Sequence, residues 1–236
     1  MPVEAALKIG DQADLTEYVR SCGADLVGWG DVSEGLAGEL THLPAAISLA
    51  MVHPPAGNVV RVGGRLAYDH RSTSLDHMLE GIQKNLVREV KSHGYRALAI
   101  PPDTRRDDRR FIARLFPLFP HKTAATCAGL GWIGKNGLLI NERYGSRLAW
   151  ATVLTNAPLP VHGTPVTAGR CGACRRCVEA CPAQALSDRE WVRSALAPPQ
   201  IDVRACSGYL MENQKVLGRA LCGLCLMACP YNKRRG

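Results

Sequence analysis

The chain has 236 residues, of which 46% are apolar and 21% are charged, and its formal charge is +8. That length allows one large domain and a small one, and the ordinary composition excludes a low-complexity chain. A positive charge is weak evidence for a nucleic-acid partner, because it specifies neither a fold nor a groove. No apolar run approaches the roughly 18 residues of a membrane span, and the first residues lack the features of a signal peptide. We therefore expect a cytoplasmic protein with no membrane partner.

The first fifty residues predict a helix followed by two strands. Apolar side chains recur at helical spacing over residues 11–23, and Gly23 suits the C-cap of that helix. Residues 24–30 are short, apolar and bounded by glycines, as is typical of a buried strand. The continuous apolar run at 45–52 predicts an interior strand. A helix followed by strands begins an α/β pattern.

A long amphipathic helix dominates the next segment. Residues 58–69 carry Gly63 and Gly64 and are expected to be irregular, after which apolar residues at helical spacing predict a helix over 74–93. His77 lies near its apolar stripe, where a core or boundary role outweighs a ligand role. A third strand is expected at 95–102. The mixed charges at 103–110 favour a solvated turn or helix start over a phosphate-binding track.

The most informative segment outside the cysteine motifs begins at His121. Small residues at 124–128 favour a helix packed closely on a flat surface or another backbone. Gly129, Gly131 and Gly134 then allow backbone amides to approach a ligand at positions where a Cβ would collide. Their spacing matches G-x-G-x-x-G, but the run follows a helix and not a strand, which disfavours a dinucleotide site. A cofactor-binding loop of another type, or a purely structural turn, remains.

The centre of the chain ends in a linker. Residues 138–141 and 148–154 predict two strands that pair in an antiparallel manner. Three prolines between residues 155 and 169 indicate a linker, which divides the chain into domains at 1–160 and 161–236. In the second domain a helix is expected within 177–186, and residues 200–202 favour a short strand or turn.

Eight cysteines in the second domain form two motifs. The first is C-x2-C-x2-C-x3-C-P and the second is a lone cysteine followed by C-x2-C-x3-C-P. The first spacing is that of bacterial two-cluster ferredoxins, in which the fourth cysteine ligates the other cluster. Crossing the ligands in the same way predicts two [4Fe-4S] clusters. One would be held by Cys171, Cys174, Cys177 and Cys229, and the other by Cys181, Cys206, Cys222 and Cys225.

Disulfides and zinc are the alternatives for these cysteines. Disulfides require an oxidising, secreted context, for which the first residues give no sign. Zinc sites more often show paired C-x2-C motifs than three cysteines followed by Cys-Pro. Cys22 has no partner cysteine nearby in sequence and is expected in the core. Two clusters are the favoured interpretation, and they imply transfer of single electrons.

The chain resembles the epoxyqueuosine reductase family, whose members are relatives of the reductive dehalogenases. The resemblance is carried by AGLGWIGKNGLLIN at 128–141, by the TNAPLP turn at 155–160, and by the two cysteine motifs, which end in CPYNK. It runs over nearly the whole chain and includes the long helix around His77. Its most specific part is AGLGWIGK together with the order of the cysteines.

This resemblance implies an α+β architecture, with a nitroreductase-like α/β domain that binds base-off cobalamin and a ferredoxin-like domain that supplies electrons through two [4Fe-4S] clusters. A low-potential donor such as ferredoxin or flavodoxin would reduce the clusters. The family reduces a modified tRNA nucleoside. The family motif transfers a cofactor-facing role to these residues: Gly129, Gly131, Trp132, Gly134, Lys135 and Asn136.

Two departures from the family pattern favour a substrate other than tRNA. An ungapped count places Leu115 where the family has a catalytic aspartate, and a leucine cannot donate a proton. Asp103, Asp107 and Asp108 lie upstream, with no reason to prefer one of them. The chain also ends six residues after Pro230, so the C-terminal helical repeats of many members are expected to be missing. His121 is the alternative candidate for a proton source, although a helix-start role explains it as well.

Three functional hypotheses follow. The first is an iron-sulfur reductase with cobalamin as its second cofactor and an unidentified substrate. The second replaces cobalamin with flavin, because a nitroreductase-like core suits either large planar cofactor. The third is a ferredoxin-type electron carrier or an activator of a corrinoid protein, in which the first domain binds only a protein partner.

Overall fold

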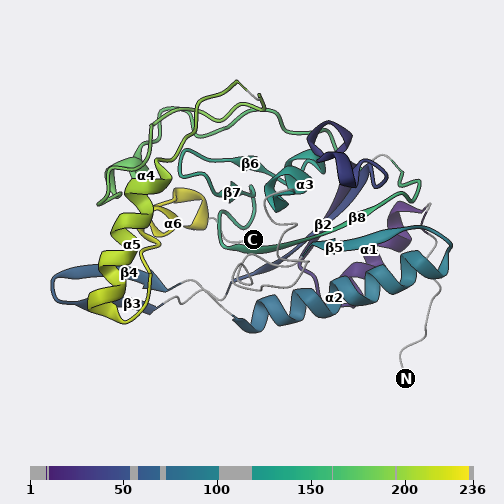
Figure 1. Cartoon of the computed structure of the whole chain (residues 1–236), viewed down its shortest axis with the longest axis horizontal. Helices are drawn as coiled ribbons and strands as arrows, with labels where there is room; N and C mark the ends of the chain where they lie inside the picture. The colour runs from purple at the N-terminus through teal and green to yellow at the C-terminus, as the bar shows by residue number, and fades with distance from the viewer. Residues whose placement is uncertain are drawn as a thin grey trace. The chain divides into compact units, whose positions relative to one another are not determined.

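The computed structural model describes residues 9, 11–53, 58–69, 73–100, 119–160, 162–194 and 196–233. The chain forms two compact units (Figure 1). The first unit takes Met1–Val52, Ser72–Leu130 and Ala149–Val166, and the second takes His53–Arg71, Gly131–Leu148 and Thr167–Gly236. The second unit therefore includes two segments that precede the predicted boundary at 160. The sequence pattern of a short strand indicates that it pairs, but not which unit it packs against. The sequence analysis therefore did not place these segments in the second unit.

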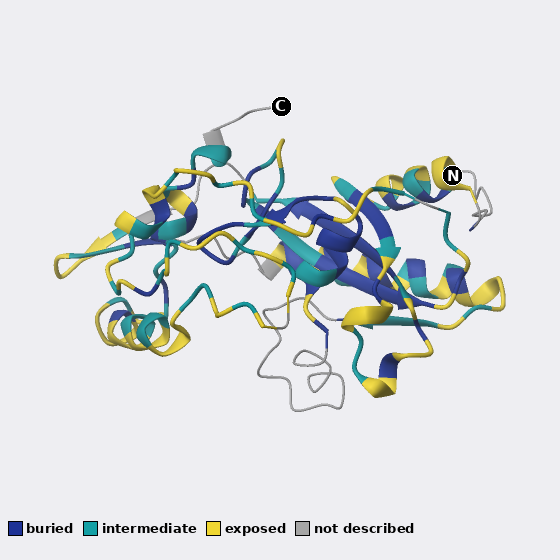
Figure 2. Cartoon of the chain, turned by 90° about the horizontal axis from the view of Figure 1, so that it is seen from above, coloured by how far each residue is buried: buried dark blue, intermediate teal, exposed yellow. Residues whose placement is uncertain are grey.

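The first unit is built on a four-stranded sheet with the strand order β1-β2-β8-β5 in the described residues. Its strands are β1 (Leu26–Asp31), β2 (Ala45–Val52), β8 (Leu148–Thr155) and β5 (Ala97–Ile100). β1 pairs antiparallel with β2, and β5 pairs antiparallel with β8. The two central strands are buried over most of their length (Figure 2). This burial explains why β2 reads as a continuous apolar run rather than an alternating one.

Two helices cover one face of this sheet. Helix α1 (Gln12–Ser21) starts at Asp11, whose carboxylate accepts hydrogen bonds from the amides of Ala13 and Asp14. Helix α2 (Thr73–Ser92) extends along the sheet (Figure 1). Leu15 and Val19 of α1 and five apolar residues of α2 pack with alternate residues of β2 and β8 to form the main core. In the positions where the sequence predicted helices and strands before residue 53, the structure contains them.

Helix α3 (His121–Cys127) covers the opposite face of the sheet. Ala124 and Cys127 pack with Ala46 of β2 and Leu154 of β8, which alternate with the residues of the main core along their strands. Ala124, Ala125 and Thr126 are completely buried. Small side chains allow this close approach, and the predicted packing of residues 124–128 on a flat surface is confirmed.

The second unit is rich in short elements. Strands β3 (Asn58–Val62) and β4 (Arg65–Asp69) form an antiparallel hairpin, and β6 (Trp132–Ile133) pairs antiparallel with β7 (Leu139–Ile140). Both findings correct the sequence analysis. Residues 58–69 are not irregular, because Gly63 and Gly64 with positive φ values make the hairpin turn. Residues 138–141 pair with β6 and not with β8, which pairs instead with β5.

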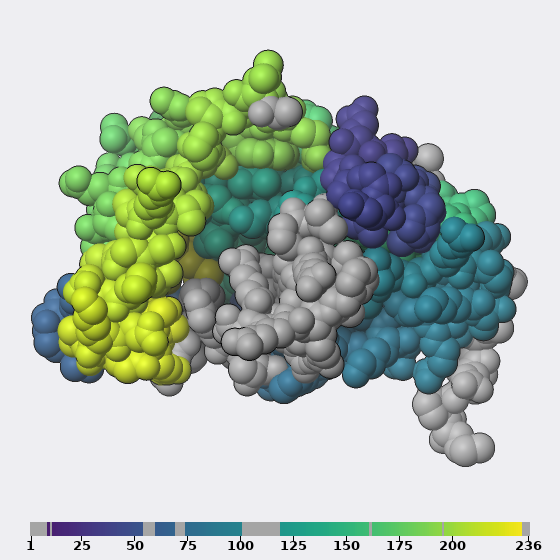
Figure 3. Space-filling model, viewed as in Figure 1, coloured from purple at the N-terminus to yellow at the C-terminus, as the bar shows by residue number. Residues whose placement is uncertain are grey.

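The helices of the second unit carry three of the motif cysteines, Cys177, Cys206 and Cys225. They are α4 (Arg176–Glu179), α5 (Val203–Leu217) and α6 (Leu224–Met227), followed by the 3-10 helix η5 (Pro230–Lys233). Helix α5 was not predicted. Its Asp202 N-cap and left-handed Gly218 C-cap are sequence signals that could have identified it. Figure 3 shows α5 beside the β3–β4 hairpin, where a Cβ on Gly63 would lie 3.0 Å from Val216.

Candidate metal centres

Four cysteines from both motifs surround one hollow in the second unit. The walls of this hollow, which we call the first site, include Lys135, Asn136, Ile140, Pro230 and Tyr231 together with Cys171, Cys174, Cys177 and Cys229. The first three cysteines come from one loop and from α4. Cys229 arrives from the end of α6, which packs against α4. The crossed arrangement predicts these four cysteines as the ligands of one cluster, and that ligand role stays a prediction.

The remaining four cysteines form a second group. Burial raises the pKa of Cys206 and of Cys222, a thiolate at Cys181 adds to both rises, and a thiolate at Cys206 adds to that of Cys222. Thiolates at Cys181, Cys206 and Cys222 also add to the rise in the pKa of Cys225. We call Cys181, Cys206, Cys222 and Cys225 the second site, because each of the last three is affected by the charge of other members of this set. A thiolate at Cys177 of the first site also raises the pKa of Cys225, so the two sites are electrostatic neighbours.

Burial disfavours the thiolate form of cysteines in both groups unless a positive charge compensates it. It raises the pKa of Cys177 to about 11, and thiolates at Cys171 and Cys229 add to the rise. It raises the pKa of Cys225 to about 12, with Cys222 as the largest thiolate contribution. Several thiolates can gather in such a place only with cations to balance them, which the irons of a cluster supply. In the described part of the chain, no group of three or more His, Cys, Asp or Glu side chains is placed to hold a single metal ion.

Hydrogen-bond donors also point toward the first site. The backbone N–H of Lys135 donates to the Cys171 thiol and lowers its pKa, against the larger effect of burial. The indole N–H of Trp132 also lowers the pKa of Cys171, but it lies outside hydrogen-bonding geometry, so this buried nitrogen has no hydrogen-bond partner among the described residues. Donors to ligand sulfur stabilise the charge of an iron-sulfur cluster, so this unpaired donor fits a cluster at the first site.

The glycines predicted to face a cofactor make close contacts within their own units. A Cβ on Gly129 would lie 2.8 Å from the carbonyl oxygen of Thr164. A Cβ on Gly131 would meet the Ile140 carbonyl oxygen, and one on Gly134 would meet the Ile140 side chain. Close approach was expected from the sequence, and the structure shows such an approach to other parts of the chain. The cofactor-facing role of these residues stays a prediction.

The two polar residues of the same loop contact the cysteine segments. Lys135 donates to the Gly172 carbonyl oxygen at 2.8 Å and pairs with Asp188. Asn136 donates from its amide to the carbonyl oxygen of Cys225 at 3.3 Å. Both side chains are buried, with 6% and 3% of the residue exposed. Trp132 packs edge-on against Tyr231, next to the end of the second motif.

His121 lies at the first position of α3 and is buried. Its Nδ1 lies 2.9 Å from the hydroxyl oxygen of Thr152 in β8. Its predicted role as a proton source is not tested by this contact. His77 is exposed on α2, and Cys22 is half-buried against the main core. Leu115, Asp103, Asp107 and Asp108 lie outside the described residues.

Two asparagines hold the second motif in place and were missed by the sequence analysis. The side-chain oxygen of Asn232 accepts from the Ser146 backbone N–H at 2.8 Å, and its amide donates to Leu226. Asn213 is fully buried in α5 and donates to the carbonyl oxygen of Leu221, the residue before Cys222. A buried asparagine in an exposed helix is a signal in principle, but the sequence does not show which backbone groups it reaches.

Known proteins share the cysteine domain of this chain and much of its sequence. Residues 170–232 match the family model described as a 4Fe-4S double cluster binding domain. The chain is 36% identical over 123 residues to the epoxyqueuosine reductase of Xanthomonas campestris, covering 48% of this chain and 32% of that protein. It is 37% identical over 125 residues to the epoxyqueuosine reductase of Synechocystis, covering 48% and 39%. The matched part is thus roughly a third of these curated relatives.

Solved structures show the same fold over nearly all of the chain. An epoxyqueuosine reductase in complex with an epoxyqueuosine-modified tRNA stem loop has a TM-score of 0.65 at 20% identity, covering 95% of this chain and 66% of that one. A reductive dehalogenase described with a mechanism for B12-dependent dehalogenation has a TM-score of 0.68 at 19% identity, covering 99% and 34%.

The fold and the family model define a mixed α/β protein that carries a 4Fe-4S double cluster binding domain. Within that class, its sequence and fold are similar to epoxyqueuosine reductases, and its fold is also similar to that of reductive dehalogenases. The resemblance given by AGLGWIGK and the cysteine order is confirmed. Among the described residues, no helix is both long and apolar enough to span a membrane.

Proposed function

We propose that this chain is an iron-sulfur reductase that passes single electrons through two [4Fe-4S] clusters to a cobalamin, for reduction of a substrate still to be identified. The observation that carries the proposal is the joining of Cys229 to Cys171, Cys174 and Cys177 around one hollow. Two motifs that exchange their last ligand bring two clusters close together, as electron transfer between them requires.

The chain's own residues would supply ligands, donors and burial to these clusters. Cys171, Cys174, Cys177 and Cys229 would hold one cluster, and Cys181, Cys206, Cys222 and Cys225 the other. The N–H groups of Lys135 and Trp132 would donate toward the first. Burial of Cys177 and Cys229 limits access of water to the same site. Such control of exposure and hydrogen bonding sets the reduction potential of a cluster.

Cobalamin is proposed as the second cofactor, in a nitroreductase-like first domain. The support is the likeness to a dehalogenase whose structure is described with B12-dependent chemistry, together with the AGLGWIGK motif. Bound cobalamin would supply the carbon-directed reduction, while the protein would supply its position and environment. His121 is the proposed proton source. Replacing His121 with Gln would move the pH profile of turnover if the proposal is right, and would only lower stability if His121 is structural.

The substrate class is a separate proposal. A relative in the structural comparison was solved with a modified tRNA stem loop, so a tRNA substrate is possible for this fold. Leu115 at the position of the family's aspartate favours a different substrate. Reduction of an epoxyqueuosine-containing stem loop by the reconstituted chain would contradict that preference.

Anaerobic reconstitution tests the proposal. We expect eight irons and eight sulfides per chain, and an absorption spectrum of bound corrinoid after incubation with cobalamin. A flavin spectrum, with no retained corrinoid, would replace cobalamin by flavin. Eight irons with neither cofactor under any condition would favour an electron carrier or a corrinoid-protein activator, and would contradict the reductase.

The electron donor is proposed to be a low-potential acidic protein, such as a ferredoxin or flavodoxin. The second unit has 17 Lys and Arg against 7 Asp and Glu, a formal charge of +10 within a chain of +8. Two clusters with four thiolates each would lower this to about +6. Arg170, Arg175 and Arg176 are exposed around the first motif. A positive surface at a cluster site favours encounter with an acidic donor.

A further inference from the structure

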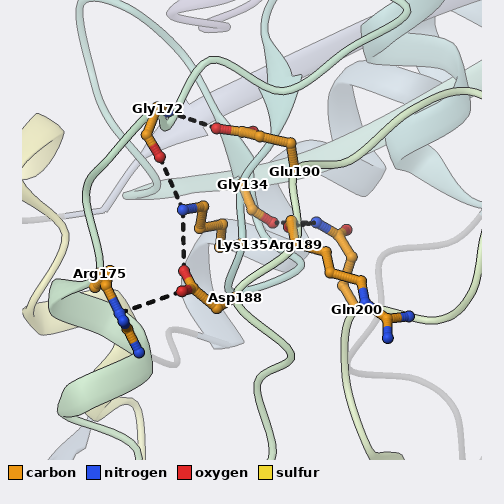
Figure 4. Close-up of polar contacts among 8 residues, drawn as sticks. All are labelled: Gly134, Lys135, Gly172, Arg175, Asp188, Arg189, Glu190 and Gln200. Carbon is orange, nitrogen blue, oxygen red and sulfur yellow. Dashed lines mark hydrogen bonds and ion pairs between the residues drawn. The ribbon is translucent and has the colours of Figure 1, made fainter.

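A buried lysine joins the β6–β7 loop to the first cysteine motif. Lys135 lies in the turn that the hydrogen bond from Gly137 to Gly134 closes, and only 7% of its side chain is exposed. Its ammonium donates to the carbonyl oxygen of Gly172 at 2.8 Å and to Asp188 at 3.0 Å (Figure 4). A lysine is rarely buried to this extent unless it is paired, because its charge must leave water. The position therefore has a specific use for a positive charge or for a long donor.

The partner carboxylate is ionised and held from two sides. Lys135 holds the pKa of Asp188 below its usual value by a direct hydrogen bond, and the charge of Arg175 adds to this effect. Arg175 lies 3.2 Å from the second carboxylate oxygen (Figure 4). Asp188 has φ +58°, a conformation that few residues other than Gly, Asn and Asp adopt readily. The acidic residue of this ion pair therefore lies at a backbone position that favours aspartate over most other residues.

Lys135 and Glu190 hold the same residue of the cysteine loop. Gly172, which follows Cys171, accepts from Lys135 through its carbonyl oxygen and donates to Glu190 through its N–H at 2.5 Å. Gly172 has φ +56°, so this loop takes a turn that glycine allows. Both hydrogen bonds fix the direction of the chain between Cys171 and Cys174. The position of two thiols in the first site therefore depends on the ammonium of Lys135.

The same lysine is also electrostatically linked to the first site. Lys135 lies in the wall of the hollow together with Cys171, and its ammonium donates to the residue that follows Cys171. A nearby positive charge stabilises added negative charge on the thiolates and on anything they bind. Reduction adds one electron to a cluster. A buried ammonium beside its ligand consequently favours the reduced state.

We propose that Lys135, paired with Asp188, is a positioning residue that braces the Cys171–Cys174 loop and raises the reduction potential of the cluster at the first site. This inference rests on the proposed function, since it requires a cluster there. It assigns to Lys135 a role different from contact with a second cofactor. Asp188 moderates the effect, because its negative charge partly cancels that of the ammonium.

The two members of the pair should shift the potential in opposite directions. Lys135→Met removes the positive charge and leaves Asp188, so the first-site potential should fall. Asp188→Asn leaves the ammonium uncompensated, and Asn tolerates the positive φ, so the potential should rise. For each variant the ratio of reduced to oxidised cluster at a fixed potential should change by roughly tenfold, which is about 59 mV for a one-electron couple. The measurement is a redox titration of the reconstituted full chain followed by electron paramagnetic resonance.

A matched control separates charge from general disturbance. Lys215→Met removes an exposed lysine that pairs with Glu212 at 2.7 Å on α5, and it should leave both potentials unchanged. Shifts of both test variants in the same direction, or no shift in either, would overturn the proposal. If Lys135→Met loses the first cluster, Asp188→Asn decides alone, and only an upward shift supports it. A wild-type chain without eight irons would instead overturn the proposed function.

Discussion

A Cβ on Gly30 would lie 2.6 Å from the carbonyl oxygen of Cys127, so the end of α3 rests directly on the backbone of β1. Ala124 and Ala125 of the same helix are completely buried, and they allow the helix to come this close. The segment from Gly129 to Asn136 follows directly after this end of α3. The geometry of β1 and α3 therefore sets where the AGLGWIGK segment begins.

Gly30→Ala is expected to destabilise the first unit. A methyl group at this position must displace backbone, and such overpacking costs about 1–3 kcal/mol. The free energy of unfolding in urea measures the effect. Gly38→Ala is the control, because a Cβ there meets nothing within 4 Å. Equal stability of the two variants would contradict the close contact of α3 with β1.

Asn213→Ala is expected to weaken the second site. Asn213 accepts from Arg65 at 2.8 Å and donates to the carbonyl oxygen of Leu221, so the substitution leaves buried groups unsatisfied. The expected cost is about 1–3 kcal/mol, with faster loss of iron to a chelator. Gln214→Ala, at the exposed neighbouring position, should change neither quantity. Iron retention equal to that of the control would show that Asn213 does not hold the segment before Cys222.

Cys181→Ala and Cys229→Ala test the crossing of the two motifs. Each variant should lose one cluster and disturb the other. Cys181 belongs to the first motif but is assigned to the second site, and Cys229 belongs to the second motif but is assigned to the first site. Iron and sulfide analysis measures the loss. Cys22→Ala removes a thiol that packs against the core of the first unit and should keep eight irons. Eight irons in either test variant would disprove the crossed assignment.

Reduction by an acidic low-potential donor should slow as salt rises. The second unit carries a formal charge of +10, and salt screens its attraction for an acidic partner. Arg176→Gln, at an exposed position in the first motif, should reduce both the rate at low salt and its salt dependence. Arg20→Gln, in the first unit, serves as the control. Stopped-flow reduction rates without salt dependence would remove the argument for an acidic donor.

Much of the first unit could be predicted from the sequence, because its elements are determined locally. The apolar run of β2 predicted a buried strand, and the periodicity of α2 predicted a long helix, since both patterns report directly on burial. The short elements of the second unit were predicted poorly. Residues 58–69 are interrupted by two glycines and residues 138–141 are only four long, so neither segment specifies a partner strand, and tertiary contacts decided their pairing.

By itself the sequence predicted the cluster domain of this protein, which matches a 4Fe-4S double cluster binding domain. Eight cysteines at ferredoxin spacing predicted two clusters, because three thiols on one tight loop need a fourth from elsewhere. Only the tertiary structure showed what the GWIGKN residues contact. Lys135 and Asp188 are 53 positions apart in the chain and meet at 3.0 Å. No local pattern encodes such a pair, because it exists only when the β6–β7 loop and the cysteine loops fold against each other.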